Sequence, residues 1–177
     1  MTDRAHSLRS DLLAARLEPE ELTPFLAVLE QGAHVFDRHH YLPGHVTGSG
    51  IVAHPFERTV ALVHHDALDL WVQPGGHVEA EDEDVAAGAR REVTEETGLD
   101  DLALLGLLDV DVHVFPERGD RPQHLHYDVR YAFSARVDRL VAGDGVRQVR
   151  WVAFDAALAL DESVARPVRR MAALLGW

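Results

Sequence analysis

The sequence predicts an α+β fold, with a mixed sheet between helices as an α/β/α sandwich and a short helical segment at the N-terminus. Three observations predict it. Two amphipathic helical patterns open the chain, a carboxylate-rich helix lies between groups of strands, and another helical pattern closes it. Strands on both sides of a central helix, followed by a helix, are typical of a layered architecture around one core.

The N-terminal segment is predicted from two amphipathic stretches with a helix signal in the second. Glu20 and Glu21 stand in the first turn of the second helix, and Gly32 follows it. A loop with a turn at Pro43 comes next. We therefore expect a helical extension over residues 1–45 and the main domain over residues 46–177. Within the extension, the predicted helices are 6–17 and 19–31, and the predicted loop is 35–48.

The main domain is predicted from alternating apolar and polar residues bounded by Pro and Gly. Gly98 stands where the central helix should end. The loop 116–122 joins the two longest strands and could cover a site, although most such loops only connect. The predicted strands are 50–54, 59–64, 70–73, 104–115, 123–137 and 146–152, and the predicted helices are 82–97 and 161–175.

The composition limits the classes of function. With 177 residues, 46% of them apolar, the chain can bury one core. The net charge of -13 disfavours nonspecific binding to nucleic acid or anionic membranes, so we expect neither as a partner. The absence of cysteine excludes disulfides, Cys-bound zinc and thiol catalysis. We find no signal peptide pattern and no membrane-length apolar run, and we expect a cytoplasmic location.

The central helix carries the strongest chemical signal. Glu92, Glu95 and Glu96 share one side of it, although like charges four residues apart cost about 0.2–0.5 kcal/mol. Grouped carboxylates are the ligands that Mg²⁺ and Mn²⁺ prefer. The preceding Gly75 and Gly76 let the backbone approach a ligand closely. We therefore predict a metal site made of the three glutamates and the Gly76 carbonyl.

This segment resembles the Nudix box. Residues 91–99 fit the second half of its pattern, Arg-Glu-apolar-any-Glu-Glu-any-Gly-apolar. From Gly76 to Glu83 there are six intervening residues where the pattern has five, which indicates a one-residue insertion before the helix. The spacing from the glycine selects Asp82 as the first acid of the box, and the spacing from the helix selects Glu83. Both candidates remain open at this point.

The resemblance implies a Nudix fold and the hydrolysis of a nucleoside diphosphate linked to another group. Candidate substrates are nucleoside triphosphates, oxidised or not, ADP-ribose, nucleotide sugars and CDP-alcohols. The implied cofactor is Mg²⁺, or Mn²⁺ in its place, and the family often forms homodimers. Glu92, Glu95 and Glu96 would hold the metal, with Arg91 in the catalytic group because it can pair with Glu95. The general base varies in the family, and Glu92 is a candidate here.

The resemblance to the Nudix box is also compatible with two other functions. A non-catalytic nucleotide sensor of this family usually has a degraded box or an added DNA-binding domain, and neither is found here. The isopentenyl diphosphate isomerase branch resembles the Nudix fold but uses an essential cysteine, which this chain lacks. Hydrolysis is therefore the favoured prediction.

Two strands show a polar face of unusual composition. The face of the first presents Asp109, Asp111 and His113, and the face of the second presents four residues: His124, His126, Asp128 and Arg130. This face is either solvated or the wall of a substrate pocket. For the second case we predict substrate contacts from His126, Asp128 and Arg130, with Arg130 on a phosphate, and from His77 beside the glycines. A zinc site of His124, His126 and Asp128 is the less favoured alternative.

Overall fold

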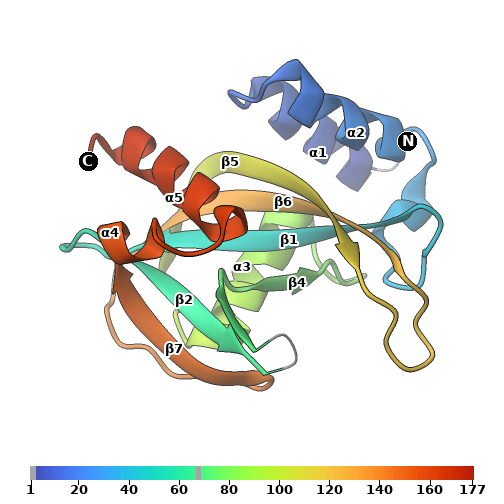
Figure 1. The fold of residues 1–177 in the computed structure, drawn as a ribbon. Coiled ribbons are helices and arrows are strands. Elements are labelled where there is room, and N and C mark those ends of the chain that lie inside the picture. The colour runs from blue at the N-terminus through green and yellow to red at the C-terminus, as the bar shows by residue number, and fades with distance from the viewer. Residues whose placement is uncertain (1–2, 67–68) are drawn as a thin grey trace.

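The computed structural model describes residues 3–66 and 69–177 and confirms the α+β sandwich. A mixed seven-stranded sheet has the order β3-β2-β1-β6-β5, with β4 paired to β1 and β7 paired to β2. Helices cover both faces of this sheet (Figure 1). The elements are α1 (Asp3–Ala14), α2 (Pro19–Leu29), the 3-10 helix η1 (Ala33–Phe36), β1 (Gly44–Ala53), β2 (Thr59–His65), β3 (Leu70–Val72), β4 (Gly75–His77), α3 (Val85–Thr97), β5 (Leu102–Phe115), β6 (His124–Ala135), β7 (Val146–Ala153), α4 (Phe154–Ala157) and α5 (Glu162–Leu175).

Alternation along β6 assigns the helices to the two faces of the sheet. On one face, Tyr127 contacts Phe25 of α2 edge-to-face at 5.7 Å, and the Tyr131 hydroxyl donates a hydrogen bond to Asp11 of α1. The same hydrophobic cluster includes the apolar side of α3. On the other face, Ala132 joins a second cluster with residues of α4 and α5. The alternating pattern of the sequence thus produces two apolar layers, one on each side of the sheet.

The sheet divides along β1, and this division creates the space for a site. β1 pairs in parallel with β6 from Gly44 to Ala53, but it pairs with β2 only at Ala53 and with β4 only at residues 47–49. β2, β3 and β7 therefore form an arm that turns away from β6 and β5 (Figure 1). Side chains from this arm and from β5 and β6 can reach the space between the two parts of the sheet.

The predicted loop 35–48 was wrong, because β1 begins at Gly44 and η1 occupies Ala33–Phe36. β1 is buried along its whole length, so it lacks the alternation that reveals a half-exposed strand. Its glycines serve close packing. A Cβ on Gly50 would lie 2.3 Å from Cγ2 of Val93, so α3 could not lie as close to the sheet. The short elements β4 and α4 were also not predicted.

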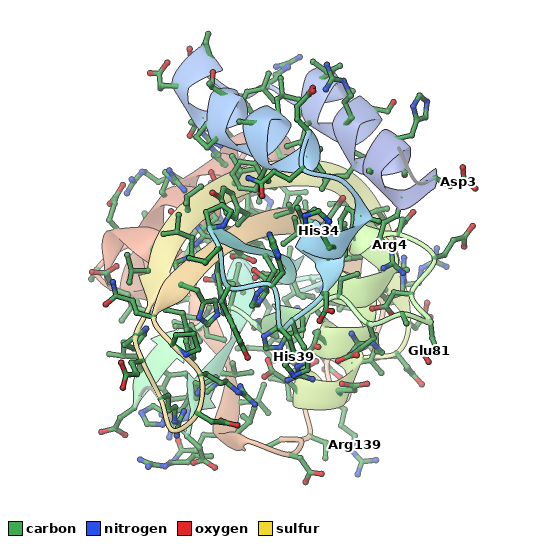
Figure 2. All side chains as sticks on the ribbon, turned by 90° about the vertical axis from the view of Figure 1, so that its right-hand side faces the viewer. Asp3, Arg4, His34, His39, Glu81 and Arg139 are labelled. Atoms are coloured by element: carbon green, nitrogen blue, oxygen red, sulfur yellow. The ribbon has the colours of Figure 1, made fainter. Side chains whose placement is uncertain are left out.

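The N-terminal helices contact the main domain directly. α1 and α2 contribute apolar residues to the cluster that contains β6 and α3. Arg4 of α1 donates hydrogen bonds to the backbone carbonyls of Glu79, Ala80 and Asp82, in the loop before α3 (Figure 2). The boundary at residue 45 stays a prediction. Within the described part of the chain, no helix is long and apolar enough to cross a membrane.

Candidate active site

A cleft of about 700 Å³ opens where the sheet divides. α3 contributes carboxylates to it, β4 contributes two glycines, β1 contributes the hydroxyls of Thr47 and Ser49, and β6 contributes His126. The β5–β6 loop lies over another part of its rim. Besides Gly76, eight of the predicted site residues line this cleft: His77, Arg91, Glu92, Glu95, Glu96, His126, Asp128 and Arg130.

The ends of α3 fix which of its sides faces the cleft. Asp84 caps the N-terminus by accepting a hydrogen bond of 2.7 Å from the Ala87 amide, and Gly98 ends the helix in the left-handed conformation, with φ of 72°. Val85, Ala89 and Val93 are buried toward the sheet. The glutamates at 92, 95 and 96 lie beside this buried side and line the cleft, and they share one side of the helix, as predicted.

Two of the glutamates lie against the glycine strand β4. A Cβ on Gly76 would stand 2.7 Å from the Glu92 carboxyl carbon, so a larger residue there would displace this carboxylate from its place against β4. The Gly75 amide donates a hydrogen bond of 3.1 Å to Glu96 Oε2. Glu95 differs, because its side chain is 58% exposed and pairs with Arg91 at 3.1 Å. Glu92 and Glu96 thus form the inner part of the acidic group.

Arg91 organises this group, and its partners decide which acid begins the box. Its Nε and Nη2 bind the two carboxylate oxygens of Asp82 at 3.1 and 3.0 Å, and Nη2 also donates to the His77 carbonyl at 2.8 Å. Its Nη1 reaches Glu92 at 2.9 Å. Burial would raise the pKa of Asp82, but the Arg91 hydrogen bond lowers it below its usual value. Asp82 therefore fills the structural position, whereas Glu83 is exposed.

The inner carboxylates fit a divalent cation. Burial raises the pKa of Glu96 to about 7, and it also raises that of Glu92 against the opposing effect of Arg91. Among the described residues, Glu96 has no cationic partner, and the Gly75 amide is its hydrogen-bond donor. A buried carboxylate that repels its neighbours is stabilised by a metal ion. The donor set is all oxygen, which suits Mg²⁺ or Mn²⁺.

The structure gives Asp128 and Arg130 a different role from the one predicted. Asp128 accepts hydrogen bonds from Ser49 at 2.6 Å, Thr47 at 3.2 Å and Arg130 Nε at 2.9 Å. The Arg130 side chain is 1% exposed and also binds Asp109 at 3.0 Å. The buried guanidinium is already bound by carboxylates, which disfavours the predicted contact of Arg130 with a phosphate.

These residues belong to a larger network of ion pairs, which we call the Asp–Arg network. It joins β5, β6, α5 and α2, and so it links α5 and α2 to the sheet and to each other. Arg166 binds Asp109 at 3.0 Å and Asp111 at 3.2 Å, and Arg170 binds Glu21 at 2.6 Å. The network consists of Glu21, Asp109, Asp111, Asp128, Arg130, Arg166 and Arg170. The polar strand face is therefore neither solvated nor simply a pocket wall.

His77 and His126 reach the cleft as predicted, but the alternative zinc set does not form. Asp128 is taken by its hydroxyl and guanidinium partners, so it is not available beside His124 and His126. His45 of β1 lies there instead, with its ring 4.8 Å from that of His126 and 5.1 Å from that of His77. Burial lowers the pKa of His45 to about 4, of His77 to about 3 and of His126 to about 2.

Three arginines at the cleft were not predicted. Arg38 comes from the segment before β1, and Arg118 and Arg121 come from the β5–β6 loop, where residues 118 and 121 form an isolated bridge. Arg38 contacts Glu79 at 3.2 Å, whereas no ion pair in the described residues involves Arg118 or Arg121. The available signal was the presence of two arginines in a Pro/Gly-rich loop between the polar strands.

Comparisons with solved structures show proteins of the same fold. A C. elegans Ap4A hydrolase has a TM-score of 0.57 and 14% identity, covering 74% of this chain and 97% of that one. An E. coli dihydroneopterin triphosphate pyrophosphohydrolase has a TM-score of 0.57 and 18% identity, covering 75% and 96%. A UDP-X diphosphatase has a TM-score of 0.54 and 14% identity, covering 96% and 89%. At these identities the likeness shows the fold.

A family model decides the assignment. Among curated proteins, none matches the sequence. The model described as NUDIX domain matches residues 44–174, which begin with the first residue of β1 and include every residue of the cleft lining except Arg38. The chain therefore belongs to the Nudix family.

Proposed function

We propose that this protein hydrolyses a diphosphate bond in a nucleoside diphosphate linked to another group, and that the reaction requires Mg²⁺ or Mn²⁺. The observation that carries the proposal is the inner pair of carboxylates, Glu92 and Glu96. Both are largely buried against β4, both have raised pKa values because of burial, and Glu96 lacks a cationic partner in the described residues. Glu95 and the Gly76 carbonyl complete the proposed ligand set.

The divalent cation, when bound, would neutralise charge on the diphosphate and lower the pKa of an attacking water. The chain's own residues position the reactants. Arg91 holds Glu92 and Glu95 by hydrogen bonds and is itself fixed by Asp82, so we assign it a positioning role. Glu92, buried beside the glycines, is the candidate that takes the proton of the water.

The cleft also holds groups that suit a phosphorylated substrate. Arg118 and Arg121 are exposed at its rim without carboxylate partners in the described residues, so they can offset phosphate charge. This basic rim opposite an acidic floor suits a ligand whose anionic groups lie between them. The similar structures carry the names of enzymes for dinucleoside polyphosphates, a pterin triphosphate and UDP derivatives, and these classes define the compounds to test. The expected homodimer and the cytoplasmic location stay predictions.

The test is product release from a panel of diphosphate compounds in Mg²⁺, Mn²⁺ or EDTA, with wild type beside Glu96→Gln. The panel includes nucleoside triphosphates, 8-oxo-dGTP, ADP-ribose, nucleotide sugars, CDP-alcohols and dinucleoside polyphosphates. We expect metal-dependent turnover that falls by more than about 100-fold in the variant, because a lost ligand should cost more than a lost supporting contact. Turnover in EDTA, or an unchanged Glu96→Gln rate, would contradict the proposal.

A further inference from the structure

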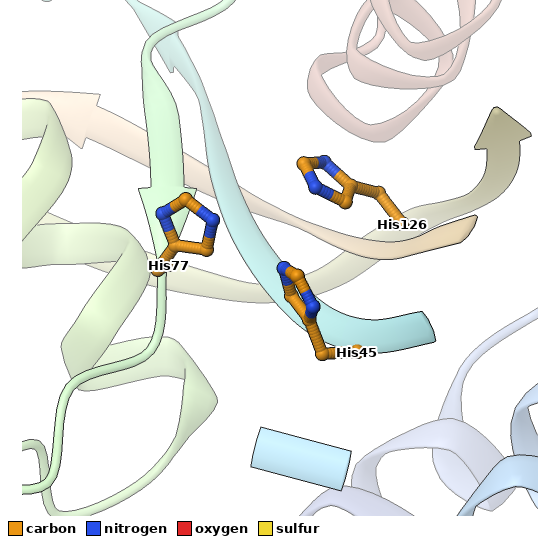
Figure 3. Close-up of side chains that lie close together, drawn as sticks. All are labelled: His45, His77 and His126. Atoms are coloured by element: carbon orange, nitrogen blue, oxygen red, sulfur yellow. The ribbon is translucent and has the colours of Figure 1, made fainter. Parts of the chain in front are cut away.

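The cleft contains a second group of side chains with the character of metal ligands. His45 lies on β1, His77 ends β4 and His126 lies on β6, and β1 is paired to both of the other strands. One ring nitrogen from each of the three histidines lies within 4.8 Å of the other two. Figure 3 shows the three imidazoles gathered on one side of these strands. We call this group the histidine cluster.

Strand pairing fixes the cluster. His45 and His126 are direct partners in the parallel β1–β6 ladder, and His77 pairs with Thr47, two residues along β1 from His45. Successive residues on a strand point to opposite faces, so positions 45 and 47 share a face. The three rings are therefore brought together by backbone hydrogen bonds, and not by flexible surface loops.

Hydrogen bonding leaves a lone pair on His45. Its Nδ1 lies 3.1 Å from the His40 carbonyl oxygen, which can only accept, so Nδ1 carries the proton. Its Nε2 is then an acceptor, and this atom is buried with no hydrogen-bond partner in the described residues. His45 is 1% exposed. An N–H to a backbone carbonyl on one side and a free lone pair on the other is the arrangement found in metal-binding histidines.

A fourth histidine supports the cluster from one side. His124 Nδ1 lies 2.7 Å from the Pro122 carbonyl oxygen, so its Nε2 carries a lone pair. That atom lies 3.1 Å from Nε2 of His126, and the Phe115 ring stacks on His126 with centroids 4.7 Å apart. These contacts hold the His126 ring in place. We assign His124 a supporting role, since it is not among the three residues whose ligand atoms lie together.

We propose that His45, His77 and His126 bind a borderline divalent cation, and that Zn²⁺ fits this donor set best. Imidazole nitrogens suit zinc, whereas Mg²⁺ prefers oxygen. Zn–N bonds of about 2.0–2.1 Å place tetrahedral ligands about 3.3 Å apart, so the rings need only adjustments on the order of 1 Å. Three protein ligands leave one position open, and His77 and His126 both line the cleft. The site adjoins the carboxylates but differs from them in chemistry.

The test measures Zn²⁺ binding to the full chain after chelator treatment, with excess Mg²⁺ present to occupy the carboxylates. Bound zinc is determined by competition with a chromogenic chelator and by elemental analysis. We expect one zinc ion per chain in wild type and an affinity lowered by more than about 100-fold in His77→Gln and His126→Gln. Glu96→Gln should keep the wild-type affinity, because the carboxylates do not belong to this site.

His54→Gln is the matched control, since His54 directly follows β1, is 8% exposed, and lies outside the cluster. It should bind zinc like wild type. Absorption of the Co²⁺ protein gives a second readout, because nitrogen ligation in a tetrahedral site should yield visible bands that disappear in His77→Gln. If His126→Gln does not fold, His77→Gln decides, because His77 is only partly buried. Wild type without bound zinc, unchanged affinity in His77→Gln, or loss of zinc in Glu96→Gln would overturn the proposal.

Discussion

The acidic side of α3 and the Asp–Arg network both gather carboxylates beside one cleft, but they differ in their cations. In the network, Asp109 contacts Arg130, Arg166 and Arg170, and no carboxylate of the network lacks an arginine. On the acidic side, Arg91 pairs with Asp82, Glu92 and Glu95, whereas no arginine among the described residues pairs with Glu96. The network supplies its own counter-charge, and the acidic side does not.

This difference separates a structural role from a catalytic one. Buried charges are costly unless they are paired, so a matched set holds elements in place, and its removal damages the fold. A partly buried set with excess negative charge is costly in the absence of a cation, so it indicates where the enzyme takes one from solution. Residue type alone does not distinguish the Asp–Arg network from the acidic side of α3, because both contain acidic residues on helices or strands near the cleft.

The largest expected effect on stability comes from breaking the matched set. In Arg130→Met, the buried carboxylates of Asp109 and Asp128 lose their shared partner, and we expect a loss of about 3–5 kcal/mol in the free energy of unfolding. Denaturant unfolding measures it. The control is Arg169→Met, whose pair with Glu162 is exposed, so its loss should be about 0–1 kcal/mol. Similar losses in both variants would mean that the buried network contributes no more to stability than an exposed ion pair.

A smaller effect on turnover is expected from the support of Arg91. Asp82→Asn weakens the two-pronged contact that fixes this arginine, and we expect kcat to fall by about 10–100-fold, the range for residues that orient ligands. Glu83→Gln, one residue further, should leave kcat within about twofold because its side chain is exposed. Steady-state kinetics on the substrate found in the panel decides this. The reverse pattern would assign the first acid of the box to Glu83.

The smallest effect concerns pH. Without a divalent cation, folded Glu96 has a pKa of about 7, raised from 4.5 by burial. Its stabilising contribution is therefore complete below about pH 4, and it is lost as pH rises through 7. We expect wild type to lose stability relative to Glu96→Gln between about pH 5 and 8, on the order of 1 kcal/mol, or about 2–4 °C in Tm.

Thermal melts in EDTA across this pH range measure that difference, and other titrating groups cancel between wild type and variant. In wild type, Mg²⁺ should raise Tm more at pH 8 than at pH 6, because a bound metal requires the ionised carboxylate. If Tm changes with pH in the same way in wild type and Glu96→Gln, the carboxyl group with the raised pKa is not Glu96.

The sequence by itself determined the elements whose signals are local. The Gly turn, the grouped glutamates and the Gly98 stop predicted α3 and its acidic side, because helix periodicity places residues 92, 95 and 96 together without long-range contacts. Alternation predicted β5 and β6 in the same way. The sequence did not decide whether Asp82 or Glu83 is the first acid of the box, because this depends on which of the two side chains contacts Arg91.

Only the tertiary structure decided what the polar strand face does. Arg130 was predicted from the sequence as a phosphate ligand, but Ser163 of α5 lies against it, and Asp109 on β5 and Asp128 on β6 bind it. His45 fell in the predicted loop, and it meets His77 and His126 only because β1 pairs with β4 and β6. The physical reason is the same in both cases. Burial and ligand grouping arise from pairings between residues far apart in the chain, and no local pattern encodes them.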